Sequence, residues 1–258
     1  MSEMNTAGTQ RPEAAATPHA EVMDTPCLET AGYPIAIDGP SGSGKSTVSR
    51  QVARELGLSY LDTGAMYRAA AWAAQHAGVE LTNQAAVTAV VRAMDLEMPL
   101  DPDNQKISCE GEDITAAIRA PELSRVVSQV AVNLEVRAEL IARQRAIIAA
   151  HPRIVVEGRD ITSVVAPEAP TKILLTASEE TRLARRAREV RGSAAPDALA
   201  ATRAEVTERD AQDSTVASFL EDREGVVTID SSQMSIADVV AAVRTLAQGS
   251  GKEQDRND

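Results

Sequence analysis

The chain has 258 residues and a formal net charge of −12, from 26 basic and 38 acidic residues. Nucleic acids and anionic membrane surfaces attract basic proteins, so this charge balance argues against both as partners. Aromatic residues make up only 2% of the chain, which disfavours recognition of nucleic-acid bases by stacking. A hydrophobic fraction of 43% is enough for one substantial core, with room for a small inserted subdomain.

The two cysteines, Cys27 and Cys109, lie far apart without metal-binding spacing, as is typical of free thiols in a reducing compartment. No stretch approaches the ~20 apolar residues of a membrane span, and the N-terminus does not resemble a secretory signal. Residues 1–32 and 249–258 show no apolar period, and we expect both to be disordered. We therefore expect a single cytoplasmic domain over residues 33–248, acting as a monomer without nucleic-acid or membrane partners.

The most informative motif follows an apolar strand expected over residues 34–38. From Gly39 to Ser46 the chain satisfies the phosphate-loop pattern G-x-x-x-x-G-K-[ST]. The loop amides and the next helix N-terminus would face an anion, Lys45 would reach the outer phosphates, and the Ser46 hydroxyl would be a ligand for Mg²⁺. The predicted nucleotide-binding residues are Gly39, Pro40, Ser41, Gly42, Ser43, Gly44, Lys45, Ser46 and Thr47.

Further strands and helices alternate along the chain. Besides the first strand, we predict strands over residues 59–62, 153–157, 172–176 and 226–230. We predict helices over residues 45–56, 63–77, 83–94 and 235–247. A long helical stretch covers residues 121–150, and a kink or break could divide it. A Thr176–Glu179 capping pair opens a cationic helix, and a polar stretch over 191–201 precedes a helix that ends at 213.

This alternation indicates an α/β protein with three layers, a five-stranded parallel sheet between two layers of helices. Residues 95–112 differ, because their pattern predicts short antiparallel strands that form a small insertion. Ligands of parallel sheets bind beyond the carboxyl ends of the strands. Residues 39–46, 62–63 and 158–160 all fall at such ends, where Arg68 and Arg159 could hold the phosphate of a second substrate.

Five segments together resemble the bacterial cytidylate kinases, which are P-loop nucleoside monophosphate kinases. They are residues 39–47, 62–68, 111–114 with 118–119, 157–160 and 209–215, in the order and spacing of that family. The resemblance covers about residues 34–246. It implies a core, a nucleoside-monophosphate-binding part enlarged by an insert at about 95–119, and a helical lid at about 182–201. It also implies transfer of the γ-phosphoryl group of ATP to CMP and dCMP, with Mg²⁺.

The resemblance also suggests how the base is recognised. Cytosine presents one donor and two acceptors on its pairing edge, so its recognition needs an acceptor and a forked donor. By the family's motifs, Asp160 and Ser128 resemble the acceptors and Arg137 the fork. Uracil has the opposite pattern at two positions and should leave Asp160 unpaired, at a cost of about 1–3 kcal/mol.

The remaining roles come from the same resemblance. Arg68, Arg159 and Arg209 would hold the acceptor phosphate, and Asp213 would accept a hydrogen bond from the ribose. Arginines of the lid, from among Arg182, Arg185, Arg186 and Arg188, would close over the transferring group. The predicted catalytic residues are Lys45, Arg68, Arg159, Arg185 and Arg186, and the predicted substrate-binding residues are Thr63, Arg68, Ser128, Arg137, Arg159, Asp160, Arg209 and Asp213.

Three positions depart from the family pattern. Val216 replaces an arginine that organises the phosphate and ribose end of the site, Thr162 replaces a usual glycine, and Ala166 replaces a usual aromatic residue. Two alternatives therefore stay open. One is a kinase for another small phosphorylated acceptor, and the other, favoured by Val216, is a catalytically weak protein that senses CMP or ATP.

Overall fold

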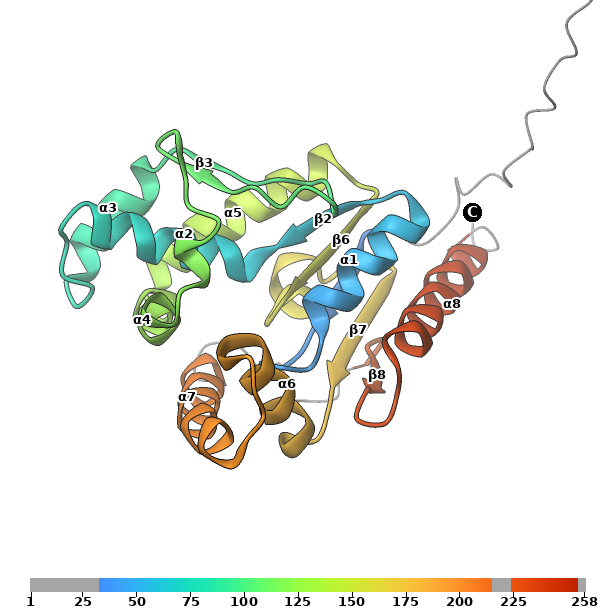
Figure 1. The fold of residues 1–258 in the computed structure, drawn as a ribbon. Coiled ribbons are helices and arrows are strands. Elements are labelled where there is room, and N and C mark those ends of the chain that lie inside the picture. The colour runs from blue at the N-terminus through green and yellow to red at the C-terminus, as the bar shows by residue number, and fades with distance from the viewer. Residues whose placement is uncertain (1–32, 215–223, 255–258) are drawn as a thin grey trace, which may run out of the picture.

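A computed structural model describes residues 33–214 and 224–254 (Figure 1). Residues 1–32, which we expect to be disordered, lie outside this part of the chain, and so does Val216. Five parallel strands form the central sheet in the order β2-β6-β1-β7-β8. They are β1 (Ile35–Asp38), β2 (Ser59–Asp62), β6 (Ile154–Gly158), β7 (Thr171–Thr176) and β8 (Val227–Asp230).

Helices cover both faces of the sheet, which gives the expected three layers (Figure 1). The helices are α1 (Lys45–Leu56), α2 (Thr63–His76), α3 (Gln84–Ala93), α4 (Pro121–Ala131), α5 (Leu134–Ala150), α6 (Glu179–Arg191), α7 (Pro196–Ser214) and α8 (Ile236–Gln254). One hydrophobic cluster joins the sheet to α1 and α8, and a second joins it to α2, α3, α4 and α5. The central strands are apolar almost throughout because both of their faces are buried.

Local sequence signals account for α1. Val48, Val52 and Leu56 form one buried stripe against the sheet, as their spacing predicts. Gly57 ends the helix in the left-handed conformation, with φ of 60°, which a residue with a Cβ rarely adopts. The first element after the phosphate loop is therefore fixed at both ends by the residues that the sequence analysis identified.

The predicted insertion is a small antiparallel sheet in the order β3-β4-β5. It comprises β3 (Leu96–Glu97), β4 (Ser108–Cys109) and β5 (Glu112–Asp113), and the short helix η2 (Ala117–Arg119) follows it. An ion pair of 2.5 Å between Arg54 Nε and Asp103 Oδ1 joins its loop to α1. Cys109 is a free, buried thiol.

Some element boundaries differ from the prediction. The stretch over 121–150 is divided by Asn133, whose side chain caps α5 by accepting from the amides of Glu135 and Val136. The capping pair predicted for α6 is wrong, because Thr176 still belongs to β7 and Ser178 is the cap, accepting from the Thr181 amide. The polar stretch over 191–201, which the resemblance assigned to a helical lid, contains the end of α6 at Arg191 and the start of α7 at Pro196.

The last helix also differs in extent, because α8 continues to Gln254, beyond the expected domain end at 248. Its predicted N-terminus is confirmed. The Asp238 carboxylate accepts from the amide and the hydroxyl of Ser235, while the Ser235 hydroxyl accepts from the Asp238 amide. Within the described ranges, no helix is both long and apolar enough to span a bilayer.

Candidate active site

A cavity of about 800 Å³ opens beyond the carboxyl ends of β1, β2 and β6. The phosphate loop, α2, α5 and α6 contribute to its walls. Eight basic side chains line it, which are Lys45, Arg50, Arg68, Arg119, Arg137, Arg159, Arg185 and Arg186. The four acidic ones are Asp62, Glu157, Asp160 and Glu189. A chain with a net charge of −12 thus concentrates an excess of four positive charges in one cavity, as anionic substrates require.

The phosphate loop has the conformation that its glycines allow. At Gly39, φ is 153° and an added Cβ would lie 2.0 Å from the carbonyl oxygen of Leu175, so no other residue fits. Gly44 precedes α1 with φ of 95°, and no described side chain caps this helix. The first amides of a helix have no partner within it, so those of α1 are available to an anion.

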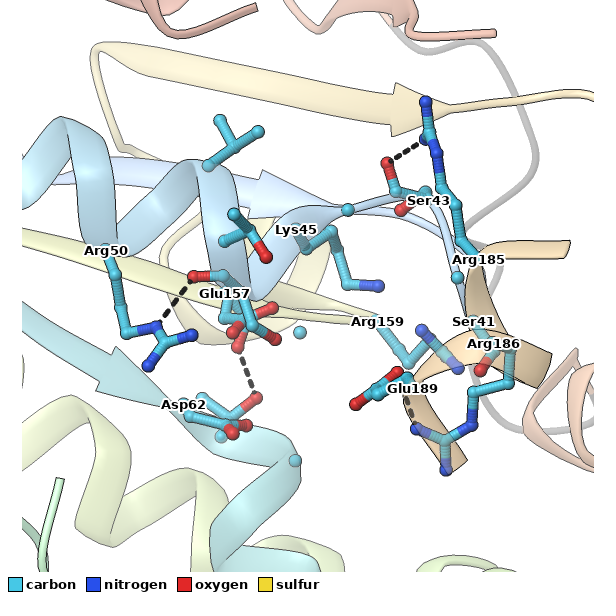
Figure 2. Close-up of a pocket in the computed structure, with 18 of the residues that line it drawn as sticks. Ser41, Ser43, Lys45, Arg50, Asp62, Glu157, Arg159, Arg185, Arg186 and Glu189 are labelled. Carbon is cyan, nitrogen blue, oxygen red and sulfur yellow. Dashed lines mark hydrogen bonds and ion pairs between the residues drawn. The ribbon is translucent and has the colours of Figure 1, made fainter. Parts of the chain in front are cut away.

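Four cationic side chains surround the phosphate loop, and each donates to a loop carbonyl. The pairs are Lys45 Nζ with Pro40 O at 2.9 Å, Arg159 with Gly39 O at 2.5 Å, Arg182 with Ser41 O at 3.1 Å and Arg185 with Ser43 O at 3.2 Å. Figure 2 shows Lys45 and Arg159 projecting into the space between the loop and α6. Positive charge is thus concentrated around the phosphate loop.

Glu157, at the end of β6, is a residue of the site to which the sequence analysis gave no role. Its carboxylate is 3% exposed and accepts a hydrogen bond of 2.6 Å from the Tyr60 hydroxyl, and it is also hydrogen-bonded to Ser46. Burial and then the nearby Asp62 carboxylate raise the pKa of Glu157, while Lys45 opposes the shift. An acidic residue that ends an otherwise apolar strand is the signal that could have identified it.

Two ion pairs line the opposite side of the cavity. Arg68 Nη2 lies 2.9 Å from Asp62 Oδ2, and both side chains are largely buried. Arg137 pairs with Asp160, and its guanidinium lies 6.0 Å from the centre of the Tyr67 ring. The two residues expected to recognise cytosine are therefore adjacent, and in this structure they bind each other.

The structure brings together most of the other predicted site residues. Thr63 lies in the cavity wall, and its hydroxyl donates to the Glu157 carbonyl at 2.7 Å. Ser128 is buried on α4 next to Val127, which lines the cavity, but Ser128 does not itself line it. The side chains of Arg209 and Asp213, both on α7, lie outside what the structure describes.

The candidate arginines of the lid occupy different positions on α6. Arg185 and Arg186 line the cavity, and Arg186 pairs with Glu189 at 2.9 Å. Arg182 binds the phosphate loop from outside the cavity wall, and Arg188 is exposed to solvent. Arg185 is also held by Ser231, through contacts of 2.9 Å to its hydroxyl and 2.8 Å to its carbonyl. Of the two arginines of α6 that line the cavity, Arg186 is therefore the one with fewer hydrogen bonds to the core.

Enzymes that transfer phosphoryl groups act mainly by positioning their substrates and by stabilising negative charge. An open helix N-terminus, a phosphate-loop lysine and arginines facing it from the other wall supply both. The fold and the cavity together define a P-loop phosphotransferase.

Comparison with known proteins narrows this class. A sequence profile of the cytidylate kinase family matches residues 35–249. Proteins named cytidylate kinase from Nocardia farcinica and Cutibacterium acnes are 45% and 43% identical to the chain over 227 and 217 residues. These matches cover 87% and 84% of this chain and 95% and 96% of the two relatives. The chain belongs to the cytidylate kinase family and is an ATP-dependent kinase.

The comparisons confirm the family that the sequence motifs indicated and, with it, phosphorylation of CMP as the reaction. Nothing in them favours a sensor or a kinase for a different acceptor. A third relative, the cytidylate kinase of Streptomyces griseus, is 44% identical over 217 residues and covers 83% of this chain. The roles of individual residues are a separate matter, which the geometry of the cavity addresses.

Proposed function

We propose that the protein transfers the γ-phosphoryl group of ATP to CMP, and to dCMP as a second acceptor, in the cavity between the phosphate loop and the Arg137–Asp160 pair. The observation that carries this assignment is that pair, a forked donor beside a carboxylate within one cavity. Cytosine offers a 4-amino donor to Asp160, and its ring nitrogen and carbonyl accept from Arg137. Uracil would present an acceptor to the carboxylate.

The donor triphosphate binds the amides of residues 39–47, with Lys45 on its outer phosphates. To do so, Lys45 exchanges the Pro40 carbonyl for a phosphate oxygen, which gives a stronger, charge-assisted hydrogen bond. The acceptor phosphate binds Arg68 and Arg159, which approach from α2 and from the end of β6. Arg209 and Asp213 on α7 complete the acceptor site, binding its phosphate and its ribose.

Transfer requires the acceptor phosphate and the donor γ-phosphate to be in line, with the developing charge stabilised. Lys45 and Arg159 project into the space between the loop and α6, and α6 also carries Arg185, directed toward Ser43, and Arg186, directed toward Glu189 (Figure 2). Closure of the segment over residues 182–201 would exclude water, which competes with the acceptor as nucleophile. Arg186 is the arginine best placed to follow the transferring group, because its partner Glu189 is on the same helix.

The residues around Ser46 fit Mg²⁺. Magnesium prefers oxygen ligands and is usually held by one or two protein groups together with substrate phosphates. The Ser46 hydroxyl and the buried Glu157 carboxylate, which are hydrogen-bonded to each other, provide this chemistry. Across the described residues no cluster of three or more metal-binding side chains occurs, so most ligands would come from phosphate and water. Bound Mg²⁺ would neutralise charge on the β- and γ-phosphates.

We further propose that the protein acts in the cytoplasm as a monomer that does not bind nucleic acid. The net charge of −12, against the local excess of positive charge in the cavity, favours small anionic ligands over polyanionic chains.

A coupled assay of ADP release with CMP, dCMP, UMP and AMP tests this assignment. We expect turnover with CMP and dCMP, a kcat/KM lower by roughly 10–100-fold with UMP, and very little turnover with AMP. The Asp160→Asn variant should lose most of the preference for CMP over UMP. A preference for AMP, or an unchanged CMP preference in that variant, would contradict the proposed base recognition.

A further inference from the structure

The turn that carries Asp160 is bonded in an unusual way. Asp160 occupies the N-cap position of the short helix η3 (Ile161–Val165), with φ of −142° and ψ of 27°. Aspartate is a preferred N-cap residue because its carboxylate accepts from the second or third amide of the helix. The Asp160 side chain makes no such cap bond here and pairs with Arg137 instead.

Asp38, from the end of β1, takes over the capping. Its Oδ1 accepts from the Ile161 amide at 2.8 Å, and its Oδ2 accepts from the Thr162 amide at 2.9 Å. The Thr162 hydroxyl adds a third hydrogen bond to Oδ2, of 2.7 Å. Asp38 is 3% exposed, so these three donors take the place of water around its carboxylate.

The arrangement resolves a competition. The first amides of a helix need an acceptor, and a buried amide without one costs about 1–3 kcal/mol. If Asp38 did not accept from the Thr162 amide, the nearest suitable carboxylate would be that of Asp160. Asp160 would then turn toward its own helix and away from Arg137. The like charge of Asp38 also disfavours Asp160 in that position.

We propose that Asp38 and Thr162 are positioning residues for base recognition: they cap η3 in place of Asp160 and keep the Asp160 carboxylate beside Arg137, where the base would bind. The inference rests on the proposed function, in which Asp160 accepts from the cytosine amino group. Thr162 acts through Asp38 and need not touch the nucleotide. Its hydroxyl holds the Asp38 carboxylate against the two amides, which a glycine at this position could not do.

Loss of the hydrogen bond between Thr162 and Asp38 should alter recognition of the phosphoryl acceptor, CMP, rather than binding of ATP. The phosphate loop beginning at Gly39 has other supports, including the packing of Gly39 against Leu175 and the arginine bond to Ser41. Loss of the Thr162 hydroxyl would therefore alter the orientation of Asp160 while the loop is still held.

The test is a double-mutant cycle of Thr162→Val and Asp160→Asn, read as the ratio of kcat/KM for CMP to that for UMP. We expect Thr162→Val to lower this ratio about tenfold, equivalent to ~1.4 kcal/mol, with the KM for ATP changed by less than about twofold. In the Asp160→Asn background, the same substitution should have no further effect on the ratio. Thr162→Ser keeps the hydroxyl and should restore the wild-type ratio.

Thr88→Val is the matched control, because Thr88 is a buried threonine that donates to Gln84 O at 2.8 Å on α3, outside the cavity. It should lower Tm to a similar degree and leave the ratio unchanged. If Thr162→Val lowers the ratio equally in both backgrounds, or not at all while Asp160→Asn abolishes it, the inference is wrong and the proposed function stands. If Asp160→Asn leaves the ratio intact, the proposed base recognition fails, and this inference with it.

Discussion

The two sides of the cavity are built from different material. The proposed donor side is mostly backbone, since it consists of the loop amides and the N-terminus of α1 within residues 39–47. The acceptor side is mostly side chains from α2, α5 and the end of β6, which lie far apart in sequence. A site built from the backbone of one segment can be predicted from a short sequence motif. A site assembled from side chains that are distant in sequence can be identified only from the fold.

The two sides also differ in the groups with which their cations are paired. On the donor side, Lys45 donates to the neutral carbonyl of Pro40, which a phosphate oxygen can replace to give a charge-assisted hydrogen bond. On the acceptor side, Arg68 and Arg137 are paired with carboxylates that also line the cavity. In the proposed function, CMP must therefore open or share these ion pairs as it binds. The acceptor side would then select more strongly among substrates, and its arginines would attract a phosphate less strongly than unpaired cations would.

The largest effect should follow from removing the charge of the donor side. Lys45→Met should lower kcat by about 10³-fold, because a preorganised positive charge at the transferring group is lost. Lys172→Met is a matched control, since Lys172 also donates to a proline carbonyl five residues earlier, at 3.1 Å, but lies outside the cavity wall. Steady-state kinetics with ATP and CMP measure both. A loss below about tenfold for Lys45→Met would contradict the role of the loop.

A smaller effect should follow from the carboxylate behind the loop. Glu157→Gln should raise the Mg²⁺ concentration needed for half-maximal turnover by roughly 10–100-fold, the range for residues that support a metal. It should also raise Tm, because a buried charge near Asp62 is removed. Glu189→Gln, which changes an exposed acid in the same cavity, should do neither. An unchanged Mg²⁺ dependence in Glu157→Gln would exclude it from metal binding.

On the acceptor side, weakening an ion pair should strengthen binding. Asp62→Asn frees Arg68 from its carboxylate while an asparagine can still cap α2, as Asp62 does by accepting from the Ala65 amide. Calorimetric titration should show a Kd for CMP about two- to fivefold lower, because Arg68 no longer has to leave a carboxylate in order to bind the acceptor phosphate. Weaker CMP binding would mean that Asp62 contributes to the acceptor site directly, and the contrast between the two sides would not hold.

A change remote from both sides should affect stability alone. Hydrogen bonds from the Ser235 hydroxyl, then its amide, lower the pKa of Asp238. A carboxylate with a lowered pKa stabilises the fold above its unfolded pKa, and this contribution is lost as pH falls through the folded pKa. Asp238→Asn should therefore lower Tm at pH 7, by a difference that shrinks as the pH is lowered from about 4 toward 2, with both KM values unchanged. A constant Tm difference across this range would contradict the ionic part of the cap.

Sequence-based prediction also succeeded for features that depend on neighbouring residues and was limited for features that depend on tertiary contacts. The apolar runs of β1 and β6, the buried stripe of α1 and the cap of α8 all depend on neighbouring residues, and they were predicted correctly. The Asn133 break and the Ser178 cap were not located, because several nearby polar residues could have served and tertiary packing decided among them. Asp38 shows the limit most clearly, since its partners lie 123 and 124 residues away.

The most direct measurement is a crystal structure of the protein with CMP, Mg²⁺ and a non-hydrolysable ATP analogue. We expect the cytosine amino group to lie within hydrogen-bond reach of the Asp160 carboxylate, and Arg137 to donate to the acceptor atoms of the base. The acceptor phosphate should lie between Arg68 and the γ-phosphate held by Lys45. A CMP base bound away from Asp160 and Arg137, or a triphosphate outside residues 39–47, would contradict it.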